Sequence, residues 1–170
     1  MGTRNLTIVK QYGKVKVAKY CQWDGYPSGQ GQTIRAFITN KLDLPLFKRQ
    51  VKKLKSLSVK AVNDLWEECG ADPKSAFTSM DIADKFKAKY PHLHRDMGGD
   101  ILEAIQDGKV EGTFKELAFK TAWDCEWVYE LDVDKETLAV YKNGTSDADY
   151  VIPFATINEG FDKVIKDHES

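Results

Sequence analysis

The sequence lacks the features that would assign it to a membrane, secreted or nucleic-acid-binding class. No apolar run is long enough to cross a bilayer, and the first residues lack the apolar core of a signal peptide. The 25 basic and 26 acidic residues give a net charge of -1, without the basic excess typical of a duplex-binding surface. We therefore expect a cytoplasmic protein that binds no membrane and for which a nucleic-acid partner is unlikely.

Cysteine and histidine are also scarce, which limits metal and disulfide chemistry. Cys21, Cys69 and Cys125 are an odd number of widely spaced residues without a C-x-x-C pair, so we interpret them as buried thiols. In an extended segment His92 and His94 would point the same way and could hold a metal, but no third ligand lies nearby. We expect no metal and no cofactor.

The chain has the length and the 42% hydrophobic content of one globular domain, residues 1–170. Alternation on both sides of the turn at 12–14 predicts an N-terminal β-hairpin, followed by a glycine-rich loop, within residues 1–31. Apolar residues then recur at helical spacing through the part 32–108, with Ser58 and Ser79 as helix N-caps.

The last part, residues 109–170, returns to period-2 alternation. The apolar residues of 114–123 lead into a strand pattern over 125–133, and further strands at 138–141 and 150–152 predict a β-meander before a terminal helix. The alternation places Cys125 on one face with Trp127 and Tyr129, which indicates a core thiol. The expected fold is α+β: a hairpin, a helical middle, a meander and a terminal helix around one core.

The loop at 22–31, Gln-Trp-Asp-Gly-Tyr-Pro-Ser-Gly-Gln-Gly, is the strongest candidate for a site. Gly25, Gly29 and Gly31 precede a helix, so we expect flexible backbone and free N–H groups at the positive end of a helix dipole, which suits a phosphate or carboxylate. The spacing matches neither a Walker loop nor the dinucleotide G-x-G-x-x-G motif. The alternative is a tight connection whose glycines only supply positive φ.

Side chains in and near this loop suggest a ligand-binding role. Trp23 and Tyr26 can stack on a ring, Asp24 can accept from a ribose or amine, and Arg95 can contact an anion. Glu126 could line a pocket or face water. The residues we expect to bind the ligand are Asn5, Gln22, Trp23, Asp24, Tyr26, Ser28, Gly29, Gln30, Gly31, Arg95 and Glu126.

A basic run occupies the helical middle and could touch nucleic acid. Charge runs of this kind on amphipathic helices are usually a solvated face, which is the interpretation we favour. Its members are Lys48, Arg49, Lys52, Lys53, Lys55 and Lys60.

Several blocks resemble a family of small proteins from tailed phages and prophages. The resemblance spans most of the chain and implies a setting in the bacterial host cytoplasm rather than a reaction. Small phage proteins of this sort are often counter-defence factors, and some bind nucleotide-derived immune signals. The blocks are MGTRNLT at 1–7, the loop at 22–31, HRDMGGDIL at 94–102, and CEWVY at 125–129 through VYK at 140–142.

The chain is also similar to the N-terminal-nucleophile hydrolases, which begin with a strand and carry a later hairpin like the one at 127–134. Their mechanism requires Cys, Ser or Thr as the first residue after processing. Removal of Met1 would expose Gly2, and Thr3 would serve only after a further cleavage. This resemblance therefore implies the fold without its nucleophile, which favours binding.

Three hypotheses follow. The first is a phage counter-defence protein that sequesters a small anionic, nucleotide-derived signalling molecule without turnover, with a homo-oligomer as a possible form. The second is an amide or phosphodiester hydrolase built around Asp24, His94, Asp96 or Glu126. The third is an inhibitor of a host protein whose aromatic loop is its anchor, which predicts an exposed loop and no small-molecule pocket.

Overall fold

The fold is α+β, as predicted, and its centre is one five-stranded sheet. The computed structural model describes residues 2–113 and 125–169, so the apolar segment expected to lead into the second strand region lies outside the described residues. The strand order is β2-β1-β5-β6-β7. The bounds are β1 (Asn5–Gln11), β2 (Lys14–Cys21), β5 (Trp127–Asp132), β6 (Thr137–Lys142) and β7 (Tyr150–Pro153).

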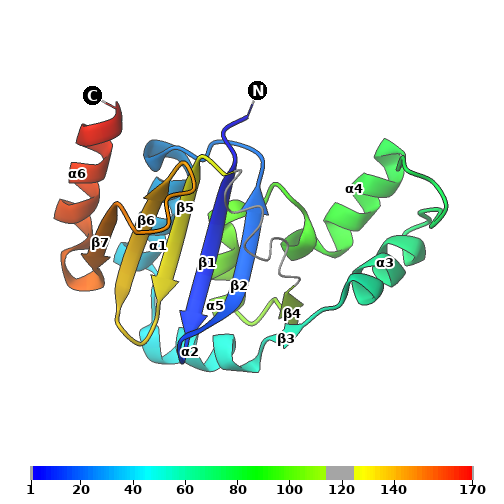
Figure 1. The fold of residues 1–170 in the computed structure, drawn as a ribbon. Helices are drawn as coiled ribbons and strands as arrows, with labels where there is room; N and C mark the ends of the chain where they lie inside the picture. Colours follow the sequence, from blue (N-terminus) through cyan, green and yellow to red (C-terminus); the bar gives the residue numbers. More distant parts are fainter. Residues whose placement is uncertain (1, 114–124, 170) are drawn as a thin grey trace.

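The predicted hairpin and the predicted meander join through the first strand (Figure 1). β1 pairs antiparallel with β2 and parallel with β5, in a register that sets Asn5 opposite both Cys21 and Trp127. The start of β1, the end of β2 and the start of β5 therefore meet at one end of the sheet. The glycine-rich loop leaves the sheet at this end.

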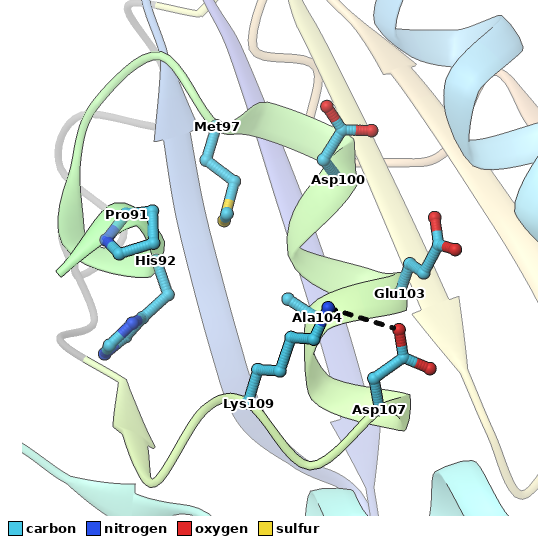
Figure 2. Close-up of a pocket in the computed structure, with 8 residues that line it drawn as sticks. All are labelled: Pro91, His92, Met97, Asp100, Glu103, Ala104, Asp107 and Lys109. Carbon is cyan, nitrogen blue, oxygen red and sulfur yellow. Dashed lines mark ion pairs between the residues drawn. The ribbon is translucent and has the colours of Figure 1, made fainter. Parts of the chain in front are cut away.

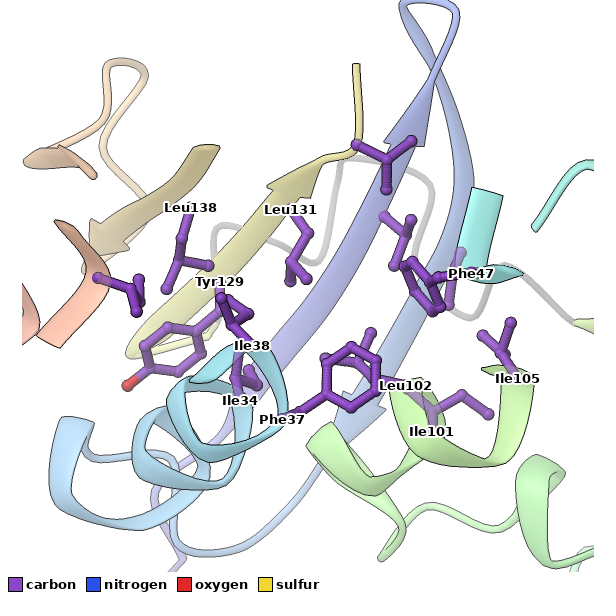
Figure 3. Packing of buried hydrophobic residues seen from close by; sticks show 14 of the residues in the cluster. Ile34, Phe37, Ile38, Phe47, Ile101, Leu102, Ile105, Tyr129, Leu131 and Leu138 are labelled. Carbon is purple, nitrogen blue, oxygen red and sulfur yellow. The ribbon is translucent and has the colours of Figure 1, made fainter. Parts of the chain in front are cut away.

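Four helices cover one face of the sheet, and their apolar side chains form the main core (Figures 1 and 3). Phe37 and Phe47 meet edge to face with ring centroids 5.4 Å apart. Burial of such side chains supplies most of the driving force for folding. The four helices are α1 (Gln32–Asn40), α2 (Leu44–Lys53), α5 (Ile101–Gln106) and α6 (Ile157–Glu169).

Two further helices stand beside the sheet, next to β2 in Figure 1. They are α3 (Val59–Glu68) and α4 (Met80–Lys89). The short strand β3 (Lys55–Ser56) precedes them in the chain, β4 (Gly112–Thr113) follows them, and these two strands pair in parallel. No helix in the described ranges has both the length and the apolarity needed to cross a membrane.

Helix starts follow the predicted caps. The side chain of Ser58 accepts a hydrogen bond from the Ala61 N–H, and that of Ser79 accepts one from the Ile82 N–H. Each hydroxyl satisfies an N–H that the first helical turn leaves without a partner.

The predicted position of Cys125 is wrong. Its thiol is buried, but it packs with Leu6, Ile8 and Val128 on the sheet face opposite the main core. The reason is local, because β5 begins only at Trp127 and the chain bends at the residue before it. Period-2 alternation therefore does not extend back to Cys125.

Candidate functional site

The loop at 22–31 lies over the end of the sheet and is held from below by Asn5. This side chain is completely buried, and its Nδ2 donates to the carbonyl oxygens of Cys21 at 3.3 Å and Trp23 at 3.1 Å. Asn5 therefore lies next to the loop, as expected, but its amide nitrogen binds the main chain. It fixes the path of the chain from β2 into the loop.

A second clamp comes from β5. The hydroxyl of Tyr129 donates to the Gly25 carbonyl oxygen at 2.8 Å, and the Gly25 N–H donates to the Thr3 carbonyl oxygen at 3.0 Å. Burial, followed by the charges of Glu169 and Asp24, raises the pKa of Tyr129 far above its ordinary value. The phenol therefore remains a neutral donor at physiological pH.

The expectation of free N–H groups in the loop is wrong for its glycine-rich half. Residues Pro27–Gly31 form a π-helical turn, and the N–H groups of Gly29 and Gly31 donate to the Tyr26 carbonyl oxygen. The Gln30 N–H donates to the Asp24 carbonyl oxygen at 2.7 Å. These donors are therefore used to build the turn itself.

One N–H group of this turn binds a carboxylate, which is the side chain of a residue in the same protein. The Ser28 N–H donates to Oε1 of Glu169 at 3.0 Å. Glu169 is the last residue of α6. The contact joins the loop to the end of the terminal helix.

The alternative explanation of the glycines, positive φ, is also wrong at Gly25, Gly29 and Gly31. Asp24 is the loop residue with positive φ, at 58°. The three glycines permit close packing instead. A Cβ on Gly31 would lie 2.7 Å from the Phe161 ring, and one on Gly29 would collide with the main-chain oxygen of Asp24.

Gln30 and Gln22 make contacts within the chain. Oε1 of Gln30 accepts a hydrogen bond from the Gly99 N–H at 2.8 Å, which joins the loop to the turn Gly98–Asp100 before α5. Oε1 of Gln22 accepts from the Tyr20 hydroxyl at 2.6 Å. Both amide oxygens therefore act in positioning the loop.

The loop presents two aromatic side chains to solvent. Trp23 is 50% exposed and Tyr26 is 51% exposed, on a backbone that Asn5 and Tyr129 hold in place. The side chains of Asp24 and Ser28 are also exposed. The exposed surface of the loop thus combines two aromatic rings with a carboxylate and a hydroxyl.

Arg95 and Glu126 have other neighbours. The exposed Arg95 lies with its Nε 3.9 Å from the Asp96 carboxylate. Glu126 accepts a hydrogen bond from the Arg4 N–H at 2.5 Å and pairs with the Arg4 guanidinium at 3.2 Å. Burial alone would raise the pKa of Glu126, but the hydrogen bonds from Arg4 outweigh it and lower the pKa. Glu126 is therefore ionised at neutral pH.

A hollow of about 430 Å³ lies on the other side of the turn Gly98–Asp100 (Figure 2). Glu103 of α5 lines it, with Asp100 directly before the helix and Asp107 directly after it, and His92 and Lys109 complete the charged and polar lining. Nζ of Lys109 lies 4.0 Å from the Asp107 carboxylate (Figure 2). The acidic lining does not favour an anionic ligand. Sequence analysis singled out His92 but missed the three acids, whose spacing of three and four residues is a signal that could have found them. The full lining is Pro91, His92, Met97, Asp100, Glu103, Ala104, Asp107 and Lys109.

The geometry assumed for a metal at the two histidines is wrong. Residues Pro91–Leu93 form a 3-10 turn rather than an extended segment, so His92 and His94 do not alternate as they would in a strand. Among the described residues no group of three or more His, Cys, Asp or Glu side chains is arranged to hold a metal. Burial, with Lys19 nearby, lowers the pKa of His92, which favours the neutral ring.

Comparisons of the chain with protein families, with curated proteins and with solved structures find no match. A functional hypothesis must therefore come from the geometry of the loop and from the sequence.

Proposed function

We propose that the protein acts by binding another protein, without turnover, and that the loop at 22–31 is its contact surface. The observation that carries this proposal is the pair of half-exposed rings, Trp23 and Tyr26, on a backbone held by Asn5 and Tyr129. It corresponds to the third hypothesis from the sequence.

Two physical arguments favour a protein partner. Trp and Tyr are the side chains most often found at the energetic centre of protein interfaces. A loop that is already fixed by its own hydrogen bonds loses little conformational entropy on binding, so more of the contact energy appears as affinity. The exposed carboxylate of Asp24 favours a partner with an apolar pocket and basic groups at its rim.

The setting of this interaction is proposed from the sequence blocks that resemble tailed-phage and prophage proteins. In that setting the partner is a protein of the bacterial host cytoplasm, and the binding protein serves as a counter-defence factor.

The experiment is affinity capture from bacterial cells with the tagged full-length protein. We compare the wild type, the Trp23→Ala/Tyr26→Ala double variant, and Tyr12→Ala as a matched control, because Tyr12 is a 66% exposed aromatic residue in the β1–β2 turn. Loss of two anchors should reduce capture of a stoichiometric partner by about tenfold or more, whereas the control should capture it normally. Equal capture by the double variant would contradict the proposal.

Sequestration of a small anionic ligand remains a second candidate, because the Ser28 N–H holds a carboxylate. A phosphate could displace Glu169 there while a base stacks on Trp23. Thermal shift and native mass spectrometry with cyclic nucleotides and ADP-ribose derivatives test this candidate. Glu169→Gln should tighten binding, since it removes a competing charge, and the compound should be recovered intact. Consumption of the compound would favour the hydrolase hypothesis instead.

A further inference from the structure

Helices α3 and α4 form an arm that has its own internal contacts. The rings of Trp66 and Phe86 stack with centroids 3.7 Å apart and planes inclined by 2°. Nζ of Lys89 lies 2.6 Å from Oε1 of Glu68, which ties the end of α4 to the end of α3. In Figure 1 the arm projects from the side of the sheet, so much of its surface faces solvent.

The tip of this arm exposes two large apolar side chains. Phe77 is 90% exposed and Met80 is 79% exposed. The tip has a defined backbone, because the Ser75 hydroxyl accepts from the Phe77 N–H at 3.2 Å and donates to the Phe77 carbonyl oxygen at 2.9 Å. Exposed apolar residues on an ordered turn are typical of an interaction surface.

A hollow of about 490 Å³ lies where the C-terminal end of α3 meets the second half of α4. Cys69 and Ala88 contribute apolar atoms to its lining, and Lys85, Lys89 and Glu68 contribute charged groups, of which Lys89 and Glu68 pair with each other. The hollow can therefore accept an apolar side chain with an acidic neighbour placed at Lys85. The full lining is Glu68, Cys69, Lys85, Ala88 and Lys89.

Acidic and basic residues are separated along α4, with the acidic residues near the tip and the basic residues near the hollow. Asp81 and Asp84 lie in its first half and Lys85, Lys87 and Lys89 in its second, all of them exposed. This order also complements the helix dipole, so it does not indicate a partner by itself. Phe77 lies beside the acidic end of α4, and the hollow lies at its basic end. This order of charges and apolar groups makes the surface of the arm complementary to that of a second arm running in the opposite direction.

We infer that the arm is the docking surface for a second copy of this chain. Antiparallel pairing of two α4 helices about a two-fold axis places Phe77 and Met80 of each copy at the hollow of the other. The same pairing sets Asp81 opposite the other copy's Lys85, whereas parallel pairing would oppose like charges. A two-fold axis makes every such contact twice.

The interface is small. A buried aromatic side chain contributes about 150–250 Å², so two copies of Phe77 and Met80 form a contact at the low end of specific interfaces. We therefore expect a monomer–dimer equilibrium that depends on protein concentration, separate from the proposed loop interaction.

Analytical ultracentrifugation of the full chain over a concentration series tests this inference. The monomer has a mass of 19.3 kDa, and the weight-average mass of the wild type should rise toward twice that value. Phe77→Asp should abolish the rise, while Tyr12→Asp, at a 66% exposed site on the β1–β2 turn, should preserve it. A wild type that stays monomeric, or a Phe77→Asp variant that dimerises normally, would overturn the inference.

A charge exchange tests the antiparallel register. Asp81→Lys and Lys85→Asp should each weaken self-association, because each homodimer then opposes like charges at both contacts. Mixing the two variants restores opposite charges at both contacts, so the heterodimer should form about tenfold or more tightly than either homodimer. Circular dichroism verifies that both variants keep their helices. A mixture that associates no better than its components would reject this register.

The thiol of Cys69 reports directly on the hollow. Cys69 is half-buried, whereas Cys21 and Cys125 are 1% exposed. Alkylation of Cys69 should slow at concentrations where the wild type dimerises, because the partner's Phe77 covers it, and should not slow in Phe77→Asp. Equal rates at all concentrations would contradict insertion of Phe77.

Discussion

Asn5 and Tyr129 fix the loop from the sheet by donating hydrogen bonds to main-chain carbonyl oxygens. The Asn5 amide serves Cys21 and Trp23, and the Tyr129 hydroxyl serves Gly25. Both side chains are completely buried. Removing such a donor leaves a carbonyl group desolvated without compensation, which costs more than the hydrogen bond itself contributes.

The first prediction concerns Asn5. We expect Asn5→Ala to lower the free energy of unfolding by about 2–3 kcal/mol, because two carbonyl oxygens lose a buried donor. Urea titration followed by Trp fluorescence measures the loss. Gln22→Ala is the control, since that half-buried side chain has one side-chain contact and should cost about 1 kcal/mol or less. Equal losses in the two variants would contradict the role of Asn5 as a clamp.

The second prediction concerns alkaline pH. Burial raises the pKa of Tyr129 well above its usual range, and burial together with the Asp167 carboxylate raises the pKa of Tyr150 to about 12. In the unfolded chain both phenols ionise at about pH 10. Above that pH the folded state therefore retains protons that the unfolded state loses. The contribution of these two phenols to the free energy of unfolding is full below about pH 10 and falls as the pH rises toward the folded pKa values.

The double variant Tyr129→Phe/Tyr150→Phe should consequently lose less stability than the wild type between about pH 9 and pH 12. Urea unfolding at several pH values measures the slope, and the difference between the two proteins removes the common effect of lysine ionisation. Parallel curves would show that these two phenols do not cause the alkaline loss.

Among the elements, the π-helical turn Pro27–Gly31 depends on close packing that only glycine permits. A Cβ on Gly29 would lie 2.5 Å from the carboxyl carbon of Asp24. The same turn uses its own N–H groups, as the hydrogen bonds to Tyr26 and Asp24 show. The turn begins directly after Tyr26, so its hydrogen bonds to the Tyr26 carbonyl oxygen fix the main chain that carries this ring.

The third prediction follows from this packing. Gly29→Ala should lower the free energy of unfolding by about 1–3 kcal/mol through steric overlap and should weaken partner capture as strongly as loss of the aromatic pair. Near-UV circular dichroism and urea unfolding measure the effect. Ser28→Ala lies in the same turn with an exposed side chain and should be nearly neutral. A Gly29→Ala variant that is as stable as the wild type and has an unchanged near-UV spectrum would contradict the predicted steric overlap at position 29.

Element boundaries were predictable because their signals are local. Ser58 and Ser79 are the N-caps of α3 and α4, as predicted. The parallel pairing of β1 with β5 was not predicted, since it joins strands more than 100 residues apart and leaves no short-range pattern. The prediction of the sheet face on which Cys125 lies was wrong because a bend interrupts an alternation that looks continuous in the sequence.

At the scale of the whole molecule, the position of the candidate site was predictable but its chemistry was not. The loop's composition marks it as special, and the structure places it at one end of the sheet. Which of its groups face solvent depends on distant residues, such as Tyr129 and Glu169, that occupy its polar atoms. What remains outward is the aromatic pair together with the side chains of Asp24 and Ser28, and the aromatic pair shifts the proposal from a small anion to a protein.

Site-specific photo-cross-linking in bacterial cells tests the central claim most directly. A photoreactive phenylalanine analogue replaces Tyr26, which is 51% exposed, in one strain and Tyr12, a 66% exposed ring in the β1–β2 turn, in another. We predict that position 26 cross-links to one host protein, that Trp23→Ala abolishes the product, and that position 12 gives none. The absence of a cross-link at position 26, or the same product at position 12, would contradict a role for the loop as the contact surface.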